Sequence, residues 1–183
     1  VRTQRKLIDP MLRSGLALSG YNHRGSRDAE DDGVLTALEA ASLDLRGTAM
    51  VVLSACETGL GKVRTGEGVY GLKRALALAG SESQALTLWK VDDDATEALM
   101  TRWYTKLQQG EDRLDALRAT QLAMAQGTMG PKGFKPRADR GAVAGDEEDE
   151  IQDTPTYEGW THPYYWAAVT FTGGTGPVKL TPP

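Results

Sequence analysis

Several residue types and patterns that define whole classes of protein are scarce in this sequence. The 183 residues include a single cysteine, which excludes an internal disulfide framework and a zinc site built on cysteines, and which suits a reducing compartment. No apolar stretch approaches the roughly 18 to 20 residues that a membrane-spanning helix needs. Residues 1–6 are not followed by the apolar segment of a signal peptide. We therefore expect a soluble, cytoplasmic protein without a membrane partner.

Clustered positive charge is missing as well. The formal net charge is −4, and the 21 lysines and arginines are scattered along the chain rather than gathered into a basic patch. Nucleic acid is therefore not an expected partner, and we expect neither a cofactor nor a metal ion. The single cysteine, Cys56, is either a buried thiol or a reactive one.

The length suits one domain with a sizeable core. The first thirty residues are polar and rich in turn-forming residues, apart from one apolar patch at residues 12–18. We interpret this opening as an extended segment rather than a first core element. It suggests that the sequence is the C-terminal part of a larger domain, either a processed chain or a fragment.

Two strands and the helix between them form the expected centre of the fold. Residues 49–55 (AMVVLSA) are a continuous apolar run rich in β-branched residues, which is typical of a central strand covered on both faces. Apolar residues at helical spacing follow over residues 69–79 and stop at Gly80, a natural helix terminator. Residues 84–89 then predict a second strand.

Three further helices are predicted. Thr36 and Glu39 have the spacing of a capping box, which predicts a short helix through residue 41. Apolar residues at helical spacing predict one helix over residues 94–110 and another over residues 112–126. The alternation of strands and helices predicts a parallel α/β sheet with right-handed crossovers.

The composition changes after the last predicted helix. Residues 127–159 are rich in Gly, Pro and charge, first basic and then acidic, which predicts a mobile insertion. Aromatic and β-branched residues over 164–172 predict a closing strand.

Cys56 stands at the carboxyl end of the most apolar predicted strand, just before a loop that contains Gly59 and Gly61. Open α/β sheets expose their sites at this edge. A nucleophile there is held by the strand, and a glycine-rich loop lets backbone amides turn toward a developing oxyanion. The alternative is an inert thiol buried beside a core strand.

A family resemblance bears on that choice. Residues 53–61 (LSACETGLG) resemble the nucleophile motif of CHAT domains, a family of caspase- and separase-like cysteine peptidases, and residues 66–72 (GEGVYGL) resemble the start of the helix that follows it. Other segments match the family in the same order along the chain, from about residue 10 to residue 173. They are residues 14–18 (SGLAL), 32–37 (DGVLTA), 43–48 (LDLRGT), 88–93 (LWKVDD) and 162–168 (HPYYWAA).

The resemblance implies a caspase-like three-layer α/β sandwich with a mostly parallel sheet, incomplete at its N-terminus, and a His-Cys dyad with Cys56 as the nucleophile. In the family the histidine precedes the cysteine and is followed by glycine. His23 is followed by Arg24, and His162 belongs to the motif of the closing strand, so neither occupies that position. The resemblance therefore implies a histidine upstream of Val1. Without this base, the isolated chain is not expected to cleave peptides efficiently.

The resemblance also implies where substrate binds. In this clan the residue two before the cysteine and the loop after the next strand line the pocket for the side chain that precedes the cleaved bond. These positions are Ser54 and residues 89–92, so Trp89 and Asp92 are implied substrate-binding residues. An inward-pointing Asp92 would select Lys or Arg, because a carboxylate pairs well with a cation. The alternative is that Asp92 only caps the following helix.

Three readings of function remain open. The first is a cysteine endopeptidase that acts on protein or peptide substrates, with the N-terminal half of the same domain and helical-repeat domains as partners, in bacterial-type signalling or defence. The second is a catalytically inactive CHAT module that serves as an interaction or signalling scaffold. The third is an unrelated α/β protein with a structural cysteine.

Overall fold

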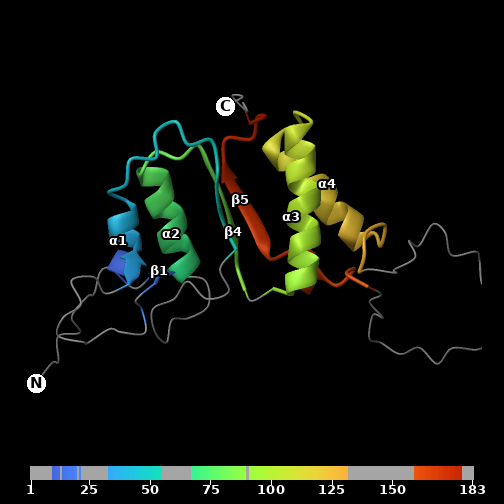
Figure 1. Cartoon of the computed structure of the whole chain (residues 1–183), viewed down its shortest axis with the longest axis horizontal. Helices are drawn as coiled ribbons and strands as arrows, with labels where there is room; N and C mark the ends of the chain where they lie inside the picture. The colour runs from blue at the N-terminus through green and yellow to red at the C-terminus, as the bar shows by residue number, and fades with distance from the viewer. Residues whose placement is uncertain are drawn as a thin grey trace, which may run out of the picture. The chain divides into compact units, whose positions relative to one another are not determined.

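The computed structural model describes residues 10–12, 14–19, 21, 33–54, 67–89, 91–131 and 159–178. The chain divides into two compact units. The first comprises residues 1–90 and 170–174, and the second comprises residues 91–169 and 175–183. Figure 1 shows the helices and strands of both units, coloured from the N-terminus to the C-terminus.

The first unit begins with a small antiparallel sheet. After the short helix η1 (Pro10–Leu12), strand β1 (Gly15–Ala17) pairs with strand β2 (Val34–Thr36). A side chain at Gly15 would place a Cβ atom 2.6 Å from the carbonyl oxygen of Leu35, so this close pairing needs glycine. The sequence predicted an extended segment here but not its pairing.

Helix α1 (Ala37–Ala40) begins at the predicted capping box. The Glu39 amide donates to Thr36 Oγ1 at 3.2 Å, and the Thr36 amide donates to Glu39 Oε2 at 2.8 Å. These reciprocal bonds satisfy two amide groups that have no partner inside the helix. The predicted start of this helix is confirmed.

A second sheet of three strands follows the order β3 (Val51–Leu53), β4 (Ser83–Thr87) and β5 (Val169–Gly173). Strands β3 and β4 are parallel and in register, with Val51 opposite Gln84. Helix α2 connects them, so the predicted strand, helix, strand order is confirmed.

Strand β5 runs antiparallel to β4. The Gly174 amide donates to the Glu82 carbonyl at 2.8 Å, while Thr170 Oγ1 donates to the Leu86 carbonyl at 3.2 Å. The later residue of β4 therefore pairs with the earlier residue near β5, as in antiparallel strands. The sheet is mixed rather than wholly parallel.

Helix α2 (Glu67–Leu78) packs against both α1 and β4 (Figure 1). Their contact is the apolar core of the first unit, which Leu53 of β3 joins as a partly buried side chain. The fully buried members of this core are Ala37, Ala40, Leu72, Ala75 and Leu86. The helix ends at the predicted glycine, because Gly80 has a φ of 104° and lets the Ser81 amide donate to the Leu76 carbonyl at 3.2 Å.

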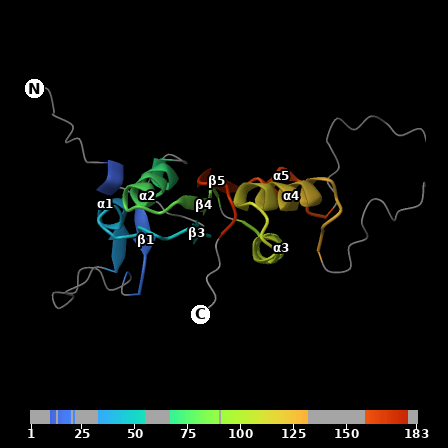
Figure 2. The ribbon, with the colours of Figure 1, turned by 90° about the horizontal axis from the view of Figure 1, so that it is seen from above.

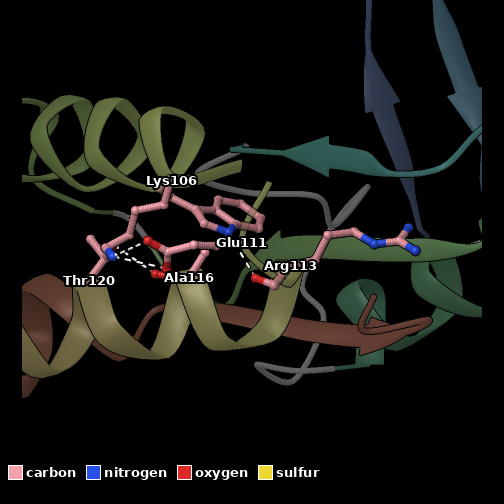
Figure 3. A network of polar contacts seen from close by, with 6 residues as sticks. Lys106, Glu111, Arg113, Ala116 and Thr120 are labelled. Carbon is pink, nitrogen blue, oxygen red and sulfur yellow. Dashed lines mark hydrogen bonds and ion pairs between the residues drawn. The ribbon is translucent and has the colours of Figure 1, made fainter. Parts of the chain in front are cut away.

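The second unit is helical. Helix α3 (Asp93–Gln108) packs against helix α4 (Arg113–Ala125), and the short helix α5 (Pro163–Trp166) contacts both. Figure 2 shows α5 beside α4. Lys106 of α3 donates from Nζ to both carboxylate oxygens of Glu111 in the following turn, at 2.8 and 3.0 Å (Figure 3).

The segment predicted as a mobile insertion, residues 127–159, is described only at its two ends. Gly127 has a φ of 67°, and the Thr128 amide donates to the Ala123 carbonyl at 2.9 Å, which closes the last turn of α4. Residues 132–158 lie outside the described residues.

The predicted closing strand at residues 164–172 is wrong in its first half. Residues Pro163–Trp166 form a helical turn, α5, and the strand begins only at Val169. Pro163 stands at the first helical position, where its missing N–H costs nothing, and His162 caps the turn. Aromatic residues generally favour a strand, but here the cap at His162 and the proline at the first helical position favour a helical turn instead.

Strand β3 also differs from its prediction. It spans three residues rather than seven, all of them half-buried, and among the described strands it stands at one end of the order β3-β4-β5. The five residues of β4 are all buried, as expected of the central strand.

Ser14 is a buried polar residue next to α2. Its side chain is fully buried, and within the described part of the chain its Oγ makes no hydrogen bond. Gly71 of α2 lies close by, because a Cβ atom built on it would overlap Ser14 Oγ. A buried hydroxyl without a partner keeps the cost of its lost hydration.

We expect Ser14→Ala to stabilise the protein by about 1 kcal/mol, which raises Tm by about 2 to 4 °C for a chain of this size. Ser81→Ala is the matched control, because Ser81 Oγ is buried with partners, donating to the Leu76 carbonyl at 2.8 Å and accepting from Gln84 Nε2 at 2.7 Å. Thermal melts of both variants decide the matter. A loss of stability in Ser14→Ala equal to that in Ser81→Ala would mean that the Ser14 hydroxyl has a partner.

Candidate active site

The structure describes the frame of the predicted site rather than the cysteine itself. Cys56 lies outside the described residues, as does His23. Ser54, two residues before the cysteine, is described, exposed, and directly follows the last residue of β3. Cys56 therefore follows two residues after the exposed Ser54, at the carboxyl end of this strand.

Ser54 and Trp89 belong to the same edge of the sheet. Leu53 is opposite Leu86 in the parallel register, so Ser54 follows at the level of Thr87, and half-buried Trp89 comes two residues later. The crossover helix α2 must run back against both strands, so its N-terminus also lies at this edge. The first unit thus brings together the carboxyl ends of β3 and β4 and the positive end of a helix dipole.

Asp92 caps helix α3. Its Oδ1 accepts a hydrogen bond from the Ala95 amide at 2.9 Å, and its carbonyl accepts from Thr96 Oγ1 at 2.7 Å. Oδ2 makes no hydrogen bond within the described ranges. The geometry therefore shows Asp92 as a helix cap, which uses one of its two carboxylate oxygens. Asp92 belongs to the second unit, whereas Ser54 and Trp89 belong to the first.

His162 also has a structural task. Its Nδ1 accepts a hydrogen bond from the Tyr164 amide at 3.0 Å, which caps α5. The imidazole nitrogen that accepts this bond uses its lone pair for it. This role agrees with the interpretation of His162 as a residue other than the catalytic base.

Ser14 and Arg113 are among the buried polar residues that were not singled out from the sequence. Arg113 is 5% exposed and donates from Nε to the Gly176 carbonyl at 2.7 Å. The sequence pattern does not indicate that a polar residue will be buried. Arg113, for example, has the pattern of an ordinary first residue of an amphipathic helix. Nearby on α3, partial burial raises the pKa of the Tyr104 hydroxyl above its ordinary value.

Metal ligands and membrane spans were also considered. Across the described ranges, no three His, Cys, Asp or Glu side chains are grouped so that they could hold a metal ion. Among the helices of these same ranges, none is long and apolar enough to cross a membrane.

The frame defines a class of protein. It is a mixed α/β domain in which a helix connects two parallel strands, and the single cysteine follows the carboxyl end of the first strand. The chain matches the CHAT domain over residues 6–174, and it therefore belongs to the CHAT domain family. This match spans both compact units. No curated protein matches the chain.

Proposed function

We propose that this chain is the cysteine-bearing part of a caspase-like endopeptidase. The observation that carries the proposal is the position of Cys56 in a CHAT-domain motif, three residues after the end of β3 and two after the exposed Ser54. The wider architecture that we propose is a three-layer sandwich, of which the sheet β3-β4-β5 with α2 on one face is a part. The test is the loss of cleavage in a Cys56→Ala variant of the complete peptidase.

The proposed chemistry needs a base from outside the described frame. A free thiol has a pKa near 8.5, so only a small fraction is ionised at neutral pH. A histidine of the upstream part takes the Cys56 proton, and the thiolate sulfur forms a bond to the carbonyl carbon of the substrate. Backbone amides near Cys56 hold the oxyanion. The C–N bond then breaks as the imidazolium returns the proton to the amine, and water hydrolyses the thioester.

The proposed partners follow from this requirement. The N-terminal half of the same domain supplies the histidine, and helical-repeat domains deliver substrate or an activating signal, as in the family that the sequence resembles. A catalytically inactive CHAT module that acts as a scaffold is the alternative. Neither histidine of this chain is followed by glycine, as the catalytic histidine of the family is. This observation favours the inactive scaffold for the chain alone.

We further propose that Ser54, Trp89 and Asp92 contact the residue before the cleaved bond, which would be Arg or Lys. Asp92 follows Trp89 by only three residues, and its Oδ2 is left over by the cap. Asp92→Asn should then lower kcat/KM for basic substrates about 10-fold or more in the complete peptidase, because it removes the charge that pairs with the cation.

Asparagine caps helices as well as aspartate does, so Asp92→Asn should leave the stability of α3 unchanged. Asp92→Ala is the matched variant, which loses both the charge and the cap and should cost about 1 kcal/mol of stability. Kinetics with a peptide library and thermal melts separate the two roles. A library preference for an apolar or acidic residue before the cleaved bond would leave Asp92 as a helix cap alone.

A further inference from the structure

Helix α4 begins without the side-chain cap that α3 has. Asp112 stands at the N-cap position of α4, but within the described residues its side chain makes no capping hydrogen bond. At the same position of α3, Asp92 Oδ1 accepts from the Ala95 amide at 2.9 Å. The first amides of a helix have no partner inside it, so a start without a cap frays more easily. The start of α4 therefore depends on contacts from other parts of the chain.

Arg113, the first residue of α4, makes two such contacts. Its side chain is 5% exposed, and its Nε donates to the Gly176 carbonyl at 2.7 Å. Its own carbonyl accepts from Trp103 Nε1 of α3 at 3.0 Å. Figure 3 shows the Arg113 side chain extending away from the pair formed by Lys106 and Glu111. One buried residue thus joins α3, the start of α4 and the segment that follows β5, all within the second unit.

The segment at residues 175–178, which we name the strap, lies against the start of α4. Pro177 pairs with Asp112 in an isolated antiparallel bridge, one residue beyond the bond from Arg113 to Gly176. Pro177 is exposed and Gly176 is half-buried, so the strap covers little apolar surface of its own. A hydrogen bond from a guanidinium is stronger than one between neutral groups. A segment held mainly by such a bond can leave without unfolding of the unit around it.

We propose that the strap is a releasable latch on the start of α4. While docked, it fixes Arg113, and the Arg113 carbonyl in turn holds the bond from Trp103 that joins α3 to α4. When the strap leaves, the buried guanidinium loses this acceptor, the uncapped first turn of α4 frays, and the Trp103 bond opens. The second unit then has two states, and any partner that captures the strap favours the open one.

Amide hydrogen exchange of the full chain tests the latch at two equivalent positions. The Ala116 amide donates to the Asp112 carbonyl at 2.9 Å, and the Thr96 amide donates to the Asp92 carbonyl at 3.0 Å, so each closes the first turn of its helix. Arg113→Met keeps a long side chain but removes the donor to the strap. In this variant Ala116 should exchange at least about 10-fold faster than in the parent, whereas Thr96, whose helix has its own cap, should change little.

A second variant should act in the opposite direction. No atom lies within 4 Å of the place that a Cβ would occupy at Gly176, and Gly176 is not among the described glycines with a positive φ. Alanine before proline is restricted mainly to extended conformations, so Gly176→Ala removes freedom chiefly from the released strap. The docked state should gain, and exchange at Ala116 should slow by about 2- to 5-fold.

The outcomes separate a latch from an ordinary loss of stability. The Trp103 indole N–H should exchange faster together with Ala116 in Arg113→Met, because both depend on the start of α4. Unchanged exchange at Ala116 would overturn the proposal. An equal rise at Ala116 and Thr96 would overturn it too, since the whole unit would then be opening. Faster exchange at Ala116 in Gly176→Ala would also contradict it. None of these measurements uses peptidase activity, so the latch and the proposed dyad stand or fail separately.

Discussion

Replacement of Cys56 by alanine should lower kcat/KM of the complete peptidase by at least about 1,000-fold, because the reaction then has no nucleophile for the substrate carbonyl. The oxyanion donors and the histidine would remain, but neither can form the bond to carbon that the thiolate forms. Cleavage of a peptide library by the two proteins, at matched concentration, measures the difference. Full residual activity in the variant would end the assignment of Cys56 as the nucleophile.

Stability and thiol reactivity provide the controls for this substitution. A small side chain beyond a strand end should contribute about 1 kcal/mol or little more, so the melts of Cys56→Ala and the parent should nearly coincide. Ser54→Ala, two residues earlier at an exposed position, should cleave far better than Cys56→Ala. A thiol paired with histidine should also be alkylated faster at neutral pH in the complete peptidase than in the chain alone. Equal rates in both would point to the inactive module.

The elements that could be predicted from the sequence are those with a local signal. Thr36 and Glu39 specify a helix start through two reciprocal bonds that need only a spacing of three residues. Gly80 specifies a helix end because its positive φ suits glycine. The crossover between β3 and β4 follows from an apolar run on each side of a helical repeat. In each case the physical cause lies within one turn or one strand of the chain.

The parts that could not be predicted depend on distant partners. Strands β1 and β2 have three residues each, which is too short to show the alternation of apolar and polar residues that identifies a strand. They are also separated by a long segment of sequence. The place of β3 at one end of the described strands depends on its neighbours rather than on its own composition. α5 was missed because three aromatic residues favour a strand, while His162 and Pro163 start a helical turn.

The structure describes part of the frame of the predicted site, and the roles of its residues stay predictions. A motif around Cys56 pointed to the edge where β3 and β4 end, and Ser54 and Trp89 do lie at that edge. The cap made by Asp92 was foreseen only as an alternative, because aspartate before a helix has the same pattern whether it binds a cation or an amide. The structure places Oδ1 on the Ala95 amide, which shows the cap, and the cation-binding role of Asp92 stays a proposal.

Trp103 carries the largest expected effect on stability. Its side chain is 0% exposed between α3 and α4, and its Nε1 donates to the Arg113 carbonyl at 3.0 Å. Trp103→Ala should lower the free energy of unfolding by about 3 to 5 kcal/mol, because it removes a large buried ring and leaves a cavity. Denaturant titration of the chain measures this loss.

Two further variants separate packing from hydrogen bonding at this position. Trp103→Phe keeps much of the ring volume but leaves the Arg113 carbonyl without its donor, so it should cost about 1 to 3 kcal/mol for the unpaired group plus a smaller packing loss. Tyr104→Ala is the control on the same helix, since Tyr104 is 42% exposed and should cost clearly less than Trp103→Ala. If Trp103→Ala cost no more than Tyr104→Ala, the contact between α3 and α4 would not be the core of the second unit. An intermediate loss in Trp103→Phe instead assigns part of the stability to the bond that fixes the first residue of α4, Arg113, whose guanidinium holds the Gly176 carbonyl.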